Sequence, residues 1–233
     1  MIVHNAIAVG LCAVLCLWSG AQSWLQSFTL EGQQLASVGE NTYFILKPGY
    51  QLTLEGKESS QRERLVVTVL TETVNIGGVD TRVVEERETR GNELLEVSRN
   101  YFAISQLTGD VYYFGEDVDM YKRGRIDSHD GSWRHGLNGA TFGLLIPGKP
   151  AVGLRYYQEL APRVAMDRAE IVSLTERVTT AAGVFDRCLK TKETTTLEMF
   201  AREYKLYAPG VGLIKDGSLE LTSHQYVPND RGR

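Results

Sequence analysis

The sequence predicts a mainly β protein whose strands form an antiparallel sheet with few short helices. Apolar, mostly β-branched residues alternate with polar ones over residues 62–73 and again over 78–89, as in strands with one face on a core and one in water. Gly77-Gly78 lies between these two runs and predicts a hairpin turn. Helical periodicity is weak, so we expect single helical turns only near Trp24–Ala36 and Met199–Glu203.

Further strands follow at short intervals along the chain. They are predicted at Tyr43–Lys47, Gln51–Gly56, Glu93–Ser105, Asp110–Phe114, Arg155–Leu160, Glu170–Thr180, Cys188–Thr195, Arg202–Ala208, Gly212–Lys215 and Leu219–Val227. Turn residues separate several neighbours, namely Gly91-Asn92, Thr108-Gly109-Asp110, Ala182-Gly183 and Asp216-Gly217. Because these connections are short, a meander of antiparallel strands is favoured over βαβ crossovers.

Two connections are unusual. Gly131–Gly153 is rich in glycine and carries apolar side chains, which predicts an irregular flap folded over the open side of the sheet. We expect Trp133 and Leu144-Leu145-Ile146 of this flap to pack close to Tyr112 or Tyr113. Pro209-Gly210 and Gly212 predict a tight turn or bulge between two strands, because glycine permits positive φ and proline donates no hydrogen bond.

The N-terminal part of the chain differs from the rest. No Asp, Glu, Lys or Arg precedes Glu31, and the apolar run Ala6–Leu17 has the length of a signal-peptide core, whereas a bilayer span needs about 20 residues. Small residues follow at Ser19-Gly20-Ala21, which favours cleavage after Ala21 and export to the periplasm or outside. The alternative is an uncleaved N-terminal membrane anchor, since no basic residue precedes the run.

The remaining chain has the size of one ordinary domain, within a total of 233 residues. We expect residues 1–21 to be the signal peptide, 22–40 a linker, 41–227 a single β domain and 228–233 a tail. The mature chain is expected to have no membrane span. A net charge of −4 without a basic stripe argues against binding to nucleic acid.

Catalytic and metal signatures are scarce. The sequence has no Gly-x-Ser-x-Gly elbow, P-loop or His-Glu-x-x-His motif, and we expect no cofactor. His129, Asp130 and His135 could ligate zinc only if their segment curled up, because their spacing fits no fixed geometry. Cys188 is the one cysteine left after cleavage. We interpret it as a small apolar residue that packs in the core, and the alternative is a reactive nucleophile.

We expect two acidic segments to lie on the solvent-exposed surface. Glu116, Asp117 and Asp119 could bind calcium, but the other oxygen ligands of a calcium loop are missing. Glu85, Glu86 and Glu88 alternate with basic residues, as on an exposed strand face. Neither segment supports paired carboxylates for acid–base chemistry.

Aromatic residues form the most informative group. Val111-Tyr112-Tyr113-Phe114 is apolar on both faces and must be covered on both, by a core or by a ligand cavity. The candidate ligand-binding residues are Tyr112, Tyr113, Phe114, Trp133, Tyr156 and Tyr207.

Three motifs carry a resemblance to a known family. Phe114-Gly115-Glu116, Gly131-Ser132-Trp133 and the run Tyr207–Leu213 (Tyr-Ala-Pro-Gly-Val-Gly-Leu), in this order, resemble a family of exported bacterial β-proteins of uncharacterised function. The last motif is also similar to one in proteins related to lipoprotein carriers. The resemblance implies a curved antiparallel sheet, a half-barrel with a hydrophobic concave face, and it carries over no catalytic residue.

Two functions are compatible with these observations. In the first, an exported non-enzymatic β-protein binds an apolar or acyl ligand, or an envelope partner, in the concave face of the sheet. In the second, the protein is a structural or assembly component of the cell envelope with a filled core and no small ligand. An apolar cavity of several hundred Å³ would favour the first, and a filled interior the second.

Overall fold

The computed structural model describes residues 23–58 and 61–228 and confirms a mainly β fold. No helix occurs among these residues, so the expected short helices are wrong. Leu25, inside the first expected helical turn, instead takes an extended form and pairs with Tyr156. At the second, β16 already begins at Arg202. In both places, β-type hydrogen bonds to another segment of the backbone replace the local hydrogen bonds of a helix.

The strands form one large sheet and one hairpin. The first half of the chain holds β1 (Leu35–Ala36), β2 (Gly39–Asn41), β3 (Phe44–Leu46), β4 (Tyr50–Glu58), β5 (Gln61–Ile76), β6 (Val79–Arg90), β7 (Glu93–Ser105), β8 (Val111–Lys122) and β9 (Arg125–Ser128). The second half holds β10 (Trp133–Arg134), β11 (Thr141–Ile146), β12 (Arg155–Tyr157), β13 (Glu159–Leu160), β14 (Asp167–Thr180), β15 (Gly183–Thr195), β16 (Arg202–Ala208), β17 (Gly212–Asp216) and β18 (Leu219–Tyr226).

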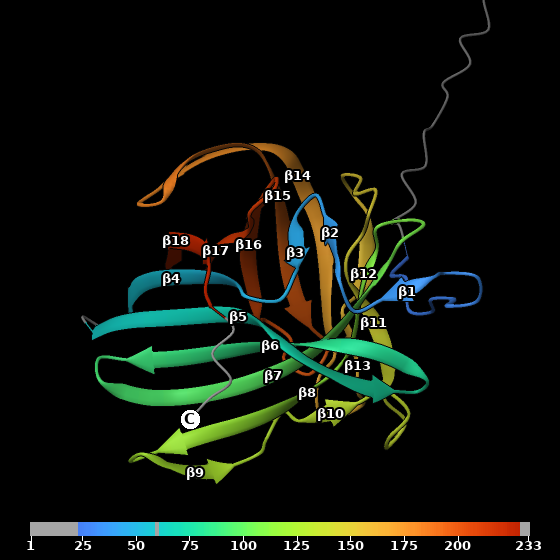
Figure 1. The fold of residues 1–233 in the computed structure, drawn as a ribbon, viewed down its shortest axis with the longest axis horizontal. Coiled ribbons are helices and arrows are strands. Elements are labelled where there is room, and N and C mark those ends of the chain that lie inside the picture. The colour runs from blue at the N-terminus through green and yellow to red at the C-terminus, as the bar shows by residue number, and fades with distance from the viewer. Residues whose placement is uncertain (1–22, 59–60, 229–233) are drawn as a thin grey trace, which may run out of the picture.

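The large sheet is antiparallel and curls almost into a closed barrel. Its strand order runs β12-β14-β15-β16-β17-β18-β4-β5-β6-β7-β8-β11-β13. The two ends of this path, β12 and β13, are separated in sequence only by Gln158, so the sheet edges meet there. Figure 1 shows the result, with β4–β8 curving across the front and β14–β16 behind them. The curvature encloses an interior between these two walls.

The hairpin β2–β3 lies at one end of this interior. Phe44 packs against Phe102 of β7 with ring centroids 5.3 Å apart, and Leu46 is fully buried. The N–H of Gly210, in the β16–β17 turn, donates to the carbonyl of Thr42 at 2.8 Å. The hairpin therefore ties two distant parts of the barrel together at this end.

The glycine-rich segment is more regular than predicted. Within Gly131–Gly153, β10 and β11 pair with β8, so the segment extends the sheet instead of forming an irregular flap. The expected contact is present, because the Trp133 and Tyr113 rings lie edge to face with centroids 5.3 Å apart. Trp133, Leu144 and Ile146 are buried by joining the sheet, which also pairs the backbone, whereas Leu137 and Val152 stay exposed.

The turn at Pro209-Gly210 is confirmed. It joins β16 to β17, and Gly210 and Gly212 have φ of 72° and 104°. The register also shifts next to it, between Leu206 and Tyr207. Glycine is required here by the left-handed backbone.

Other parts of the expected domain layout are only partly covered. β1 lies within the expected linker, residues 22–40, and β2 crosses the boundary at its end. The expected signal peptide and nearly all of the tail lie outside the described residues. Within the described part of the chain no helix is long and apolar enough to cross a membrane.

Candidate functional site

The barrel interior holds a cavity of about 220 Å³. It is lined by side chains from both walls of the barrel and from Gln158 and Glu159, where the sheet edges meet. The lining residues are Phe44, Ile45, Tyr50, Leu52, Val67, Val69, Val84, Glu86, Glu96, Ser98, Asn100, Phe102, Tyr113, Glu116, Leu145, Gln158, Glu159, Asp167, Glu193, Lys205, Tyr207, Val211, Gly212, Leu213 and Asp216. One end of this set is apolar and the other is acidic.

Strand alternation explains the apolar end. Side chains two residues apart on a strand point to the same face. Val84 and Glu86 of β6 therefore share the face that lines the cavity, as do Asn100 and Phe102 of β7. Tyr50 and Leu52 of β4 approach from the neighbouring part of the sheet. These apolar side chains are buried, and Phe44 of the hairpin lies over them. An apolar group placed at this end would leave water almost completely.

The acidic end continues the same faces of the same strands. On β6 the inward residues are Val84, Glu86 and Glu88 in turn, and their exposure rises from buried through half-buried to exposed. On β7 the side chain of Glu96 lies opposite Glu88 in the strand register. The exposure gradient shows that the interior opens to solvent at its acidic end.

Lys205 of β16 is the only cationic side chain among the described residues that line the cavity. Its Nζ lies 3.2 Å from Oδ2 of Asp216 and 3.6 Å from Oε2 of Glu193. Burial acts to lower the pKa of Lys205, but the surrounding carboxylates, Glu193 and Asp216 foremost, outweigh it and hold the pKa well above its usual value. Lys205 thus stays charged and is shared by two carboxylates.

Other interior carboxyl groups are harder to ionise. Burial raises the pKa of Glu86 to about 7, against the attraction of Lys205. Burial also raises the pKa of Glu116 and of Glu159. Repulsion from Glu86 adds to the rise at Glu116, and repulsion from Glu116 adds to the rise at Glu159. These groups consequently hold protons at pH values where surface carboxyl groups have lost them.

The predicted aromatic residues are divided by the fold. Tyr113 and Tyr207 line the cavity. Phe114 stacks on Phe142 with ring centroids 5.2 Å apart, on the other face of β8. The others line no part of it: Tyr112 packs edge to face on Phe142, Trp133 packs behind Tyr113, and Tyr156 is fully buried with its hydroxyl 3.3 Å from the carbonyl of Leu145.

The expectation of an exposed acidic face on β6 is wrong for Glu86. Glu85 and Arg87 point outward and pair with each other, whereas Glu86 points into the barrel. The signal was in the sequence, since Glu86 stands two residues from Val84 and must share its face. Glu116, Glu159 and Lys205 were not singled out as interior residues, because only the closed sheet brings their strands together.

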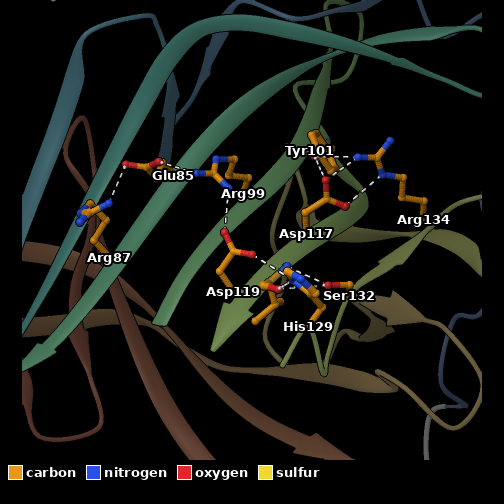
Figure 2. A network of polar contacts seen from close by, with 10 residues as sticks. Glu85, Arg87, Arg99, Tyr101, Asp117, Asp119, His129, Ser132 and Arg134 are labelled. Atoms are coloured by element: carbon orange, nitrogen blue, oxygen red, sulfur yellow. Dashed lines mark hydrogen bonds and ion pairs between the residues drawn. The ribbon is translucent and has the colours of Figure 1, made fainter. Parts of the chain in front are cut away.

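A separate polar network covers the outer face of β6, β7 and β8 (Figure 2). Asp117 accepts hydrogen bonds from the guanidinium of Arg134, with Nε 3.1 Å from Oδ1, and from the hydroxyl of Tyr101 at 2.8 Å. Burial acts to raise the pKa of Asp117, but these two partners outweigh it and hold the pKa below its usual value. The contacts fasten β10 to β8.

The same network places His129. Its Nδ1 lies 2.9 Å from Oδ1 of Asp119 and 2.9 Å from the carbonyl of Val118. Successive residues on a strand face opposite sides, so Glu116 points inward while Asp117 and Asp119 point outward. The three do not form a single acidic cluster.

His135 lies apart from His129, packed edge to face on Phe114 and Phe142 with centroids 5.9 and 5.1 Å away. Burial lowers the pKa of His135. Among residues 23–58 and 61–228, no group of three His, Cys, Asp or Glu side chains is arranged to hold a metal ion. Cys188 is fully buried and burial raises the pKa of its thiol, which fits an apolar filler.

Comparison with protein-family models, with curated proteins and with solved structures found no match for this chain.

Proposed function

We propose that the protein is an exported, non-enzymatic binding protein that holds the apolar part of a small molecule inside its barrel. The observation that carries the proposal is the cavity, which is apolar at its enclosed end and opens at its acidic end. Its volume of about 220 Å³ is just under the range of about 300–1,000 Å³ typical of small-molecule sites. An extended aliphatic chain or a single aromatic ring matches this size.

A cavity favours ligand binding over the alternative of an envelope component with a filled core. Packed interiors contain few voids larger than one water molecule. Here the apolar wall formed by Leu52, Val67 and Phe102 faces open space. Covering that wall with an apolar ligand would stabilise the complex by about 25 cal/mol for each Å² removed from water.

Binding of an uncharged apolar probe tests the proposal. We expect 1-octanol to bind with heat release or uptake measurable by isothermal titration calorimetry. Val67→Phe should weaken this binding by at least about tenfold, because the larger side chain fills the cavity. Val66→Phe is the matched control, since Val66 is the neighbouring residue on the opposite face of β5 and is not part of the cavity wall.

Thermal unfolding separates loss of binding from loss of fold. The proposal is contradicted when 1-octanol fails to bind the folded protein, or when both phenylalanine variants, still folded, weaken binding equally. In either case the interior would not be the binding site.

Export is the second part of the proposal and rests on the uncharged apolar run ending at Ser19-Gly20-Ala21. N-terminal sequencing of the protein from an exporting host should give a chain that begins at or near Gln22. An intact Met1 in a membrane fraction would instead indicate an anchored protein.

A further inference from the structure

We infer that the ligand of the barrel cavity is an amphipathic amine, with its ammonium group held among the carboxylates of the acidic end and its apolar body at the enclosed end. The inference rests on the proposed function and specifies the chemistry of the ligand. It is carried by the number of carboxyl groups in the cavity wall, by two half-buried ones without a side-chain partner, and by the aromatic side chains of the same wall.

The described cavity wall is rich in carboxyl groups and poor in basic ones. It contains seven carboxyl groups, those of Glu86, Glu96, Glu116, Glu159, Asp167, Glu193 and Asp216, against the single ammonium of Lys205. Lys205 is already engaged by Glu193 and Asp216. None of the other five carboxyl groups forms an ion pair with Lys205, and four of them, those of Glu86, Glu96, Glu116 and Glu159, are half-buried, which is costly for a charged group without a compensating charge.

Two of these carboxyl groups lack a side-chain partner, which is a second observation beside the number of carboxyl groups. The side-chain carboxyl groups of Glu86 and Glu159 are half-buried and form no side-chain hydrogen bond or ion pair with the described residues. Burial is the largest cause of the raised pKa in both, although each keeps some accessible surface because that surface faces the cavity. Buried polar groups normally find partners. A donor bound in the cavity would supply them.

The surroundings suit an organic ammonium. Tyr113 lies near Glu116, Glu159 and Glu86. Its ring centroid is 4.7 Å from that of Phe102, and the faces and edges of the two rings can contact an alkyl or aryl body. Aromatic faces also attract an ammonium. An anionic ligand such as a fatty acid would instead place its carboxylate beside Glu86 and Glu116, where like charges repel.

The same geometry makes the binding of an amine dependent on pH. Glu86 faces Glu88 on its own strand, Glu96 on β7, Lys205 on β16 and Asp216 on β17. Its carboxyl group loses its proton near pH 7. Affinity for an amine should therefore rise between pH 6 and pH 8.5, as the acidic end gains negative charge, while affinity for an alcohol stays constant.

A head-group series with one alkyl chain tests the inference. Octylamine, 1-octanol and octanoate are titrated into the full protein at pH 8 by calorimetry. We expect octylamine to bind at least about tenfold more tightly than 1-octanol, and octanoate to bind most weakly, since close charge pairs contribute about 1.5 kcal/mol or more.

Two isosteric variants locate the effect. Glu86→Gln and Glu159→Gln should each weaken octylamine binding by about fivefold to tenfold and leave 1-octanol binding unchanged. Glu85→Gln is the matched control, because it removes the same charge from the adjacent residue on the outer face of β6, where Glu85 pairs with Arg87 and Arg99. It should leave both affinities unchanged.

The outcomes separate the two proposals. Equal binding of all three probes overturns the inference and leaves the proposed function standing. Preference for octanoate, or an equal loss of octylamine binding in Glu85→Gln, also overturns it. Calcium chloride competing with octylamine at equal concentration would overturn it as well, because the site would then select a cation without regard to the apolar body. Binding of none of the probes overturns both proposals.

Discussion

At the scale of single residues, Glu86 shows how a strand side chain acquires its chemistry from its face. Glu85 and Glu86 are neighbours of the same type, yet Glu85 forms surface ion pairs with Arg87 and Arg99 while Glu86 lines the cavity. The pKa of Glu86 is raised to about 7, first by burial. The one-residue difference in position thus separates a surface ion-pair partner from a residue that lines the cavity.

Gly210 is a second residue whose role is set by its backbone. Its φ is 72°, and the space around its missing Cβ is empty, so a larger side chain costs backbone strain and not a clash. We expect Gly210→Val to lower the free energy of unfolding by about 1–3 kcal/mol, measured by urea denaturation. Gly210→Asn should cost less, because asparagine tolerates the left-handed region. Unchanged stability together with a specific loss of 1-octanol binding would show that the turn belongs to the binding site.

At the scale of strands, the closing of the barrel depends on Gly143 in β11. A Cβ on Gly143 would lie 2.2 Å from the carbonyl oxygen of Gln158 and 2.8 Å from that of Tyr157. The Gly143→Ala variant therefore requires β11 and the β12–β13 segment to separate. We expect a loss of about 1–3 kcal/mol in stability and faster amide exchange in β11–β13.

Thr141→Ala, an exposed position on the same strand, is the control for the closure variant and should change stability by less than about 0.5 kcal/mol. Equal effects of the two variants would mean that the close approach at Gly143 does not hold the barrel shut.

The strands are also the scale at which the sequence was most informative. Glu93–Ser105 was predicted with the bounds that the structure has, because alternation and turn residues act over a few neighbours. β8 extends to Lys122, beyond the predicted Phe114, because its acidic second half pairs with β7 and β9. The sequence does not predict the charged part of the cavity wall, because Glu116, Glu159 and Lys205 come together only when the sheet closes. Local patterns do not encode that closure.

At the scale of the whole molecule, the enclosed carboxyl groups link stability to pH. A carboxyl group whose pKa is higher in the folded state binds more protons when folded, so its contribution to stability is lost as pH rises from the unfolded value towards the folded one. For Glu86 this window runs from about pH 4.5 to about 7. Glu116 and Glu159 have pKa values raised in the same direction.

We therefore expect the melting temperature of the ligand-free protein to fall between pH 5 and pH 8.5, because Glu86 and Glu116 lose their protons near pH 7 and pH 8 in the folded state. The Glu86→Gln variant should show a smaller fall and melt higher than the parent at pH 8.5, while Glu85→Gln should follow the parent. Differential scanning calorimetry over this range provides the measurement. A parent melting temperature that is constant or rises with pH would contradict a protonated acidic end.

We propose that the barrel interior is an amphipathic binding site with a defined direction. A crystal structure with para-bromophenethylamine tests it most directly, because anomalous scattering locates the bromine independently of the rest of the ligand. We expect bromine at the enclosed end, against Leu52 and Phe102, and the ammonium within hydrogen-bonding distance of Glu86 or Glu159. Bromine on the outer surface, or a reversed ligand with its ammonium at the apolar end, would contradict it.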